Sequence, residues 1–172
     1  MKDQRYANMV IESLKGWSEQ DKAIIREGLL ILDMHREIEM VTEIIGSRLG
    51  LYARQLEILE ILFNHPERQL TPAQLADEIH LTRSTITGNL DSLQKKGLIK
   101  RESHPDDRRM LLITLTQKGV DFCKKTMPQR YADTLMVMKV TSKNERATLR
   151  KVYKKILEKV KELAEEKIIV NH

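Results

Sequence analysis

Residues 83–96 form the segment whose side chains are best suited to binding a ligand. Ile86, Leu90 and Leu93 are spaced by four and three residues, so on a helix they form one apolar stripe. At about 100° per residue, the remaining surface carries mostly short polar or charged side chains: Arg83, Ser84, Thr85, Thr87, Gly88, Asp91, Ser92 and Lys95. An ordinary solvated helix face is the alternative, but such faces are usually richer in Glu and Lys. A face this free of bulk can enter the major groove of duplex DNA and offer hydroxyl groups to base edges and phosphates.

A second candidate site is a polar turn further along the chain, in which Asp106 and Asp107 precede Arg108 and Arg109. A carboxylate such as that of Asp107 can orient one guanidinium while the neighbouring guanidinium is presented to a partner. An arginine at the tip of a hairpin suits the narrow, electronegative minor groove beside the site that the helix contacts. The alternative is a surface ion pair that contributes less than about 1 kcal/mol and has no part in binding.

The helices that would position these side chains can be placed from their capping residues. Thr71 and Pro72 provide an N-cap followed by proline at the first helical position. Thr82 can cap the helix of residues 83–96, and Gly97 ends it. Two short helices joined by about three to four residues are typical of a helix-turn-helix.

Two strands are predicted after the helix-turn-helix, at residues 98–102 and 110–115. A hairpin in this place is a wing, with its tip in residues 103–109. Before the helix-turn-helix, residues 53–64 are apolar on more than one side, which predicts a central, well-buried helix.

Long amphipathic helices are predicted on both sides of this segment. One begins after Ser18 and ends near residues 46–50, and the last is capped by Thr141 or Ser142, with Glu145 placed for a reciprocal bond. Their apolar stripes are larger than a small winged domain could cover, which favours a homodimer over packing within one subunit.

The predicted fold class is therefore mainly α with a small β wing (α+β). A winged helix-turn-helix DNA-binding domain at residues 51–116 lies between N-terminal dimerisation helices at 1–50 and C-terminal dimerisation helices at 117–172.

Composition and charge narrow the class of protein. The 172 residues are 41% hydrophobic and 32% charged, with only 7 Gly and 4 Pro, as expected of a mainly helical protein. The net charge is +5, and basic residues outnumber acidic ones only after residue 80, which makes nucleic acid a candidate partner.

The sequence contains neither a membrane-spanning apolar run nor a signal-peptide core, so we expect a cytoplasmic protein without a membrane partner. We expect no enzyme and no cofactor, because a Gly-rich phosphate loop, a nucleophile elbow and a metal-ligand cluster are all missing from the sequence.

The segment from Leu75 to Gly119 resembles the MarR family of transcription regulators. The resemblance rests on Leu-Thr-Arg-Ser-Thr-Ile-Thr at 81–87, Leu90, Leu93, Lys-Gly-Leu-Ile at 96–99, Arg101, Asp107, Arg109, Leu115 and Thr116. It implies a homodimer whose terminal helices interlock and whose two winged domains bind a pseudo-palindromic operator, with half-sites about 34–36 Å apart. Helix 83–96 is then expected in the major groove and the wing in the minor groove. The function we expect is sequence-specific regulation of transcription, by a repressor that a small molecule releases from DNA, although activation stays open.

The resemblance also implies control by a small aromatic or lipophilic anion, by an oxidant or by a metal. Residues expected to line an effector pocket are Met34, His35, Ile38, Tyr52 and Leu56. The single cysteine, Cys123, is more typical of a small buried hydrophobic residue than of a redox sensor. His35 and Glu39 are spaced to chelate a metal, but a polar residue at a helix packing edge is the simpler interpretation, and we expect no metal site.

A winged-helix module that binds protein is the competing class of function. The basic residues of the predicted wing and the small residues of helix 83–96 favour DNA. Salt-sensitive binding to duplex DNA distinguishes the two classes.

Overall fold

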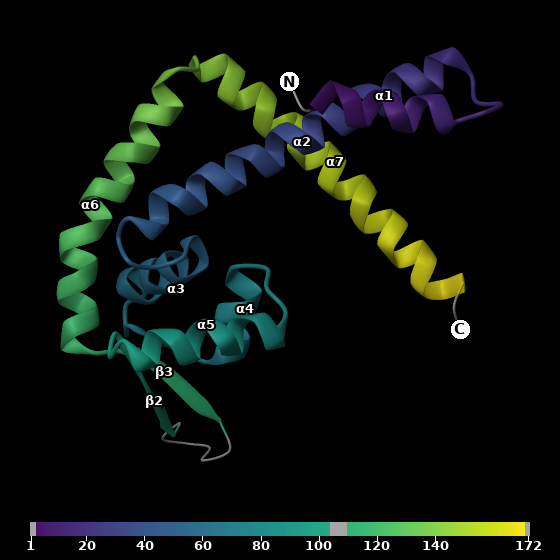
Figure 1. Cartoon of the computed structure of the whole chain (residues 1–172). Helices are drawn as coiled ribbons and strands as arrows, with labels where there is room; N and C mark the ends of the chain where they lie inside the picture. The colour runs from purple at the N-terminus through teal and green to yellow at the C-terminus, as the bar shows by residue number, and fades with distance from the viewer. Residues whose placement is uncertain (1–2, 104–109, 171–172) are drawn as a thin grey trace. The chain divides into compact units, whose positions relative to one another are not determined.

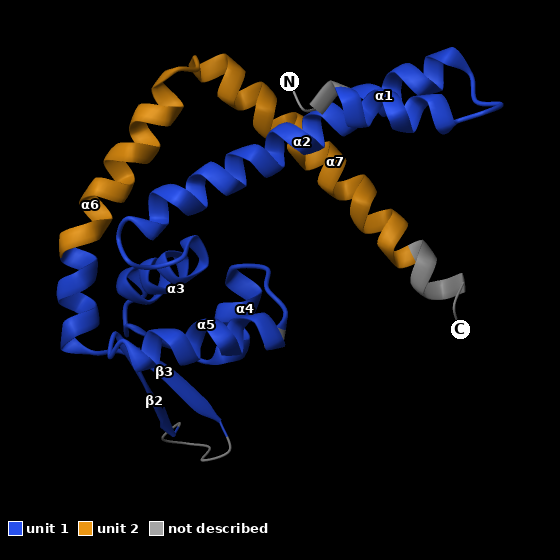
Figure 2. Cartoon of the chain, in the orientation of Figure 1, with its two compact units in different colours: residues 1–124 blue, residues 125–172 orange. Residues whose placement is uncertain are grey.

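The computed structural model describes the backbone of residues 3–103 and 110–170, and their side chains except those of residues 3–4, 83 and 166–170 (Figure 1). The chain divides into two compact units, residues 1–124 and 125–172 (Figure 2), and each is described by itself. The elements, in chain order, are α1 (Asp3–Ser13), α2 (Glu19–Ser47), α3 (Ala53–Asn64), β1 (Gln69–Leu70), α4 (Pro72–Glu78), α5 (Arg83–Lys95), β2 (Ile99–Ser103), β3 (Leu111–Leu115), α6 (Gln117–Lys139) and α7 (Lys143–Val170). The mainly helical fold class with a small sheet is confirmed.

The sheet is antiparallel, with the strand order β1-β3-β2. Strands β2 and β3 form the predicted hairpin, in which Arg101 lies opposite Ile113. The sequence predicted only these two strands. The structure adds β1, in which Leu70 pairs with Ile113 on the other edge of β3. A strand of two residues is too short to show the alternation by which a strand is predicted from sequence.

The core of the first unit is built around α3, which contacts α5 and β3. Leu56, Ile58, Leu59 and Leu62 of α3 are completely buried, as the apolar character of residues 53–64 predicted. The other large side chains buried to the same degree come from α4, α5, β2 and β3: Leu75, Ile86, Leu90, Leu93, Ile99 and Ile113, with Cys123 of α6. This core holds α5 in place from beneath.

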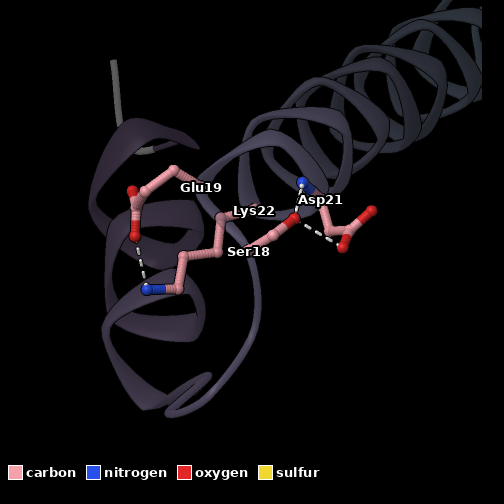
Figure 3. A network of polar contacts seen from close by, with 4 residues as sticks. All are labelled: Ser18, Glu19, Asp21 and Lys22. Atoms are coloured by element: carbon pink, nitrogen blue, oxygen red, sulfur yellow. Dashed lines mark hydrogen bonds and ion pairs between the residues drawn. The ribbon is translucent and has the colours of Figure 1, made fainter.

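The start of α2 is capped as the sequence predicted (Figure 3). The hydroxyl oxygen of Ser18 accepts a hydrogen bond from the backbone N–H of Asp21 at 3.1 Å, and the hydroxyl donates to the Asp21 carboxylate at 2.6 Å. In the same turn, the ammonium of Lys22 donates to the carboxylate of Glu19 at 2.7 Å, and this bond lowers the pKa of Glu19. Two acidic residues in the first turn also favour the helix through its dipole.

In the second unit, α7 begins with the predicted capping box. The backbone N–H of Ser142 donates to the Glu145 carboxylate at 2.7 Å, and the Glu145 N–H donates to the Ser142 hydroxyl at 3.2 Å. The guanidinium of Arg146 donates hydrogen bonds to the backbone oxygens of Met138 and Thr141. These bonds satisfy carbonyl groups at the C-terminal end of α6.

The long helices expose large apolar side chains in each unit. Those of α7 form one stripe: Leu149, Val152, Tyr153, Ile156, Leu157, Val160 and Leu163. Those of α2 include Ile24, Ile31, Leu32, Met34, Ile38, Met40, Val41, Ile44 and Ile45. Among the described residues, no helix is apolar over a length that could cross a bilayer.

Candidate nucleic-acid interface

Helix α5 begins at a small cluster of hydroxyl groups. The hydroxyl oxygen of Thr82 accepts a hydrogen bond from the backbone N–H of Thr85 at 3.3 Å, which is the predicted N-cap. The same hydroxyl lies 3.0 Å from that of Ser84 and 2.8 Å from that of Thr85. The first turn of α5 therefore presents hydroxyl groups whose positions are set by one another.

One face of α5 is locked into the core and the opposite face is open, as the spacing predicted. Ile86, Leu90 and Leu93 are at most 1% exposed. The opposite residues divide into two groups: Ser84, Thr85, Thr87, Gly88 and Lys95 are exposed, whereas Asp91 and Ser92 are half-buried. The side chain of Arg83, which the sequence placed in the same set, lies outside the described residues.

Gly88 lies in the middle of the open face. A methyl group added to Gly88 would meet no atom within 4 Å, and its backbone is that of an ordinary helix. Glycine in a helix interior costs about 1 kcal/mol relative to alanine. The fold of the described residues does not require a glycine here, so the bare backbone of Gly88 suits close approach by a partner.

An ion pair joins α5 to the first strand of the wing. A guanidinium nitrogen of Arg101 lies 2.6 Å from a carboxylate oxygen of Asp91, and the Arg101 side chain is about three-quarters buried, at 26% exposed. On the neighbouring position of β2, Lys100 pairs with Glu102 at 2.7 Å, which lowers the pKa of Glu102. From its place on the helix, Asp91 was predicted to be one of the DNA-binding side chains. Its partner shows a second role, because the pair links the orientation of the wing to that of α5.

A groove of about 410 Å³ runs beside the open face of α5. It is lined by the start of α4, by α5 and by the start of β3, through Thr71, Pro72, Ala73, Ile86, Thr87, Met110 and Leu111. Met110 and Leu111 are nearly half exposed. The groove was not predicted from sequence, where the only signal was two adjacent apolar residues at the start of a strand.

The tip of the wing carries three of the predicted site residues, Asp107, Arg108 and Arg109. These lie outside the described residues, which end at Ser103 on β2 and resume at Met110 before β3. Their predicted roles stay predictions.

The five residues predicted to line an effector pocket are not gathered in the described groove. Met34, His35 and Ile38 are exposed on α2, and Tyr52 is exposed before α3. Leu56 is 1% exposed, within the core beneath α2.

The two alternative sensor residues have contrasting environments. Cys123 is fully buried, its sulfur lies 3.8 Å from the backbone oxygen of Leu59, and burial raises the pKa of the thiol to about 11. A thiol of this pKa is almost entirely protonated at neutral pH and is a poor nucleophile. A ring nitrogen of His35 lies 3.7 Å from the Glu39 carboxylate, and no group of three or more metal-ligand side chains occurs among the described residues.

Comparison with known proteins finds relatives over this part of the chain. Residues 51–111 match the model of the MarR family. The chain is 28% identical over 137 residues to the HTH-type transcriptional repressor YetL of Bacillus subtilis, which covers 80% of this chain and 82% of YetL. It is 30% identical over 96 residues to the HTH-type transcriptional regulator MhqR of Bacillus subtilis. The matched segment covers 56% of this chain and 65% of MhqR, so the chain spans just under two thirds of that protein. Among solved structures, a mutant of E. coli MarR complexed with operator DNA is similar with a TM-score of 0.68 and 27% sequence identity, over 81% of this chain and 99% of that one.

Proposed function

We propose that this chain, whose residues 51–111 match the model of the MarR family, is a regulator of that family that controls transcription by binding duplex DNA as a homodimer. In this proposal residues 51–116 bind DNA, whereas residues 1–50 and 117–172 form the dimer. The protein acts in the cytoplasm and catalyses no reaction.

The observation that carries the proposal is the open face of α5. Its small exposed residues lie opposite a stripe that is locked into the core, so the face is rigid and also lacks bulk. A rigid helix of this kind can lie deep in the major groove, where Ser84, Thr85 and Thr87 reach base edges or phosphates. Lys95 supplies a positive charge near the end of the same face.

The wing supplies the second contact of the proposal. Arg108 or Arg109 enters the minor groove, and Asp107 orients the guanidinium. The Asp91–Arg101 ion pair supports this arrangement, because it joins the strand that leads into the wing to the helix that binds the major groove.

The exposed apolar faces of α2 and α7 support the dimer. Single exposed apolar residues are normal, whereas large contiguous apolar patches mark interfaces between proteins. Among the described residues, helix α7 exposes seven large apolar side chains and α2 exposes nine. A two-fold dimer binds a pseudo-palindromic operator, with half-sites about 34–36 Å apart.

Control by a small aromatic or lipophilic anion completes the proposal. Met34, His35, Ile38 and Tyr52 are exposed in each protomer, so a pocket that includes them would be completed by the dimer. The effector would release DNA by binding more tightly to a dimer in which the two α5 helices have the wrong spacing. The same regulator can repress or activate, according to where its operator lies.

The test is selection of duplexes from a random-sequence pool, followed by titration of the selected duplex at several salt concentrations. Affinity should fall by about 10³–10⁵ between about 50 and 200 mM salt, as expected for about 6–10 phosphate contacts. Thr87→Ala should change sequence preference by about 1 kcal/mol or more, whereas Arg109→Ala should weaken binding with the dimer intact. A chain that selects no duplex, or whose affinity is insensitive to salt, would be a protein-binding module instead.

A further inference from the structure

The end of the recognition helix α5 is tied to the loop that follows α2. The ammonium of Lys96, the residue directly after α5, donates a hydrogen bond to the backbone oxygen of Gly50 at 3.0 Å. The two residues are 46 positions apart. Gly50 adopts a left-handed conformation with φ of +75°, which turns the loop after α2 back toward α3.

The same end of α5 is also tied to the start of α6. The ammonium of Lys118 donates to the backbone oxygen of Lys96 at 2.8 Å, and the hydroxyl of Thr116 donates to the backbone oxygen of Gly97 at 2.7 Å. Lys96 is therefore bonded to the loop after α2 through its ammonium and to α6 through its backbone carbonyl.

The loop that Lys96 contacts is itself fixed to α2. A carboxylate oxygen of Glu43 accepts a hydrogen bond from the backbone N–H of Ala53 at 2.9 Å, so a side chain of α2 caps the start of α3. A methyl group at Gly46 would lie 3.4 Å from the Leu56 side chain, which shows how closely α2 and α3 approach. These contacts connect α2 to the start of α3, directly after the loop that contains Gly50, so a movement of α2 would reach that loop and Lys96.

We propose that Lys96 is a positioning residue, whose bond to Gly50 makes the orientation of α5 follow that of α2. The proposal rests on the DNA-binding function given above, in which α2 belongs to the dimer and α5 to the DNA surface. The spacing between the two recognition helices of a dimer then depends on this bond. Lys95, the preceding residue, is exposed on the open face, where the proposed function would place it against a phosphate.

Salt dependence separates the two roles. A lysine that contacts phosphate adds about 0.9 to the slope of log affinity against log salt, whereas a lysine bonded within the protein adds nothing. The matched variants are Lys95→Met and Lys96→Met, each of which removes the ammonium and keeps an unbranched side chain of similar length. Lys96→Arg restores a donor of similar reach.

The probes are the duplex that the wild-type chain selects from a random pool and a duplex with only one of its half-sites. Lys96→Met should weaken binding to the full duplex by about fivefold or more, with unchanged slope and unchanged single half-site affinity. Lys96→Arg should recover most of the loss. Lys95→Met should weaken both duplexes and reduce the slope. A reduced slope for Lys96→Met, equal loss on both duplexes, or no loss at all would each overturn the proposal.

Hydrogen exchange of the DNA-free chain provides an independent readout. In Lys96→Met, the amides of residues 48–52 and of the last turn of α5 should exchange faster, with thermal stability otherwise close to wild type. Unchanged exchange would refute the bond itself, even if the chain binds no DNA. A wild-type chain that binds no duplex while Lys96→Met exchanges faster would instead refute the function and the positioning role, and would leave the bond as a feature of the fold.

Discussion

Replacing Gly88 by alanine should stabilise the protein and weaken its binding to DNA. Gly88 is in the interior of α5, where alanine is favoured over glycine by about 1 kcal/mol. The added methyl group meets no atom within 4 Å, so no steric cost offsets this gain. For a chain of this size, a gain of about 1 kcal/mol raises the melting temperature by about 2–4 °C.

The effect on DNA should have the opposite sign. If the open face of α5 contacts the floor of the major groove, a methyl group at its centre separates the two surfaces and weakens the neighbouring hydroxyl contacts. We expect affinity for the selected duplex to fall by about tenfold or more, which corresponds to about 1.4 kcal/mol. Thermal unfolding and a fluorescence anisotropy titration on the same sample measure the two effects.

Gly28→Ala is the matched control, because Gly28 is a glycine in the interior of α2 where an added methyl group also meets nothing within 4 Å. It should raise stability by a similar amount. Because α2 belongs to the proposed dimer, the oligomeric state is measured alongside, and DNA affinity is compared only between samples that are dimeric to the same extent. Unchanged affinity in Gly88→Ala would remove the centre of α5 from the interface. A lower melting temperature would show that the fold does use this glycine.

Three further predictions concern the fold and its titratable groups. Gly119→Ala should destabilise the chain by about 3 kcal/mol in urea unfolding, because a methyl group there would overlap the backbone oxygen of Leu98; a loss below about 1 kcal/mol would show that α6 can shift away. The Cys123 thiol should react with a disulfide reagent at least about 100-fold more slowly in the native chain than in denaturant, and fast native reaction would revive the redox alternative. The hydrogen bond from the Ser142 N–H lowers the pKa of Glu145 from 4.5. The stabilising effect of the ionised Glu145 carboxylate on α7 is therefore present above pH 4.5, and it is lost as the pH falls through the lower pKa of the folded chain. An NMR titration of the Glu145 carboxyl measures this, and a midpoint at or above 4.5 would contradict the capping bond.

Features that depend on a few neighbouring residues were predictable from the sequence. The N-caps at Ser18, Thr71 and Thr82 were placed correctly, because a capping bond joins residues three positions apart. For the last helix the sequence left Thr141 and Ser142 open, and the structure selects Ser142. The buried stripe of α5 was predicted for the same kind of reason, since helical periodicity decides which residues share a face.

Features that join distant segments were not predictable in this way. Strand β1 exists only because its two residues meet the free edge of β3, about 43 positions away along the chain. The groove beside α5 likewise depends on where α4, α5 and β3 come together.

The sequence by itself therefore determined the order of the helices, their caps, the faces they bury and the chemical character of the open face of α5. The tertiary structure alone decided that Asp91 pairs with Arg101 and that Lys96 bonds to Gly50. The physical reason is the range of the interactions. Caps and helix faces follow from fixed backbone geometry over one or two turns, whereas these two pairs form only after the whole core has set the separation of their backbones.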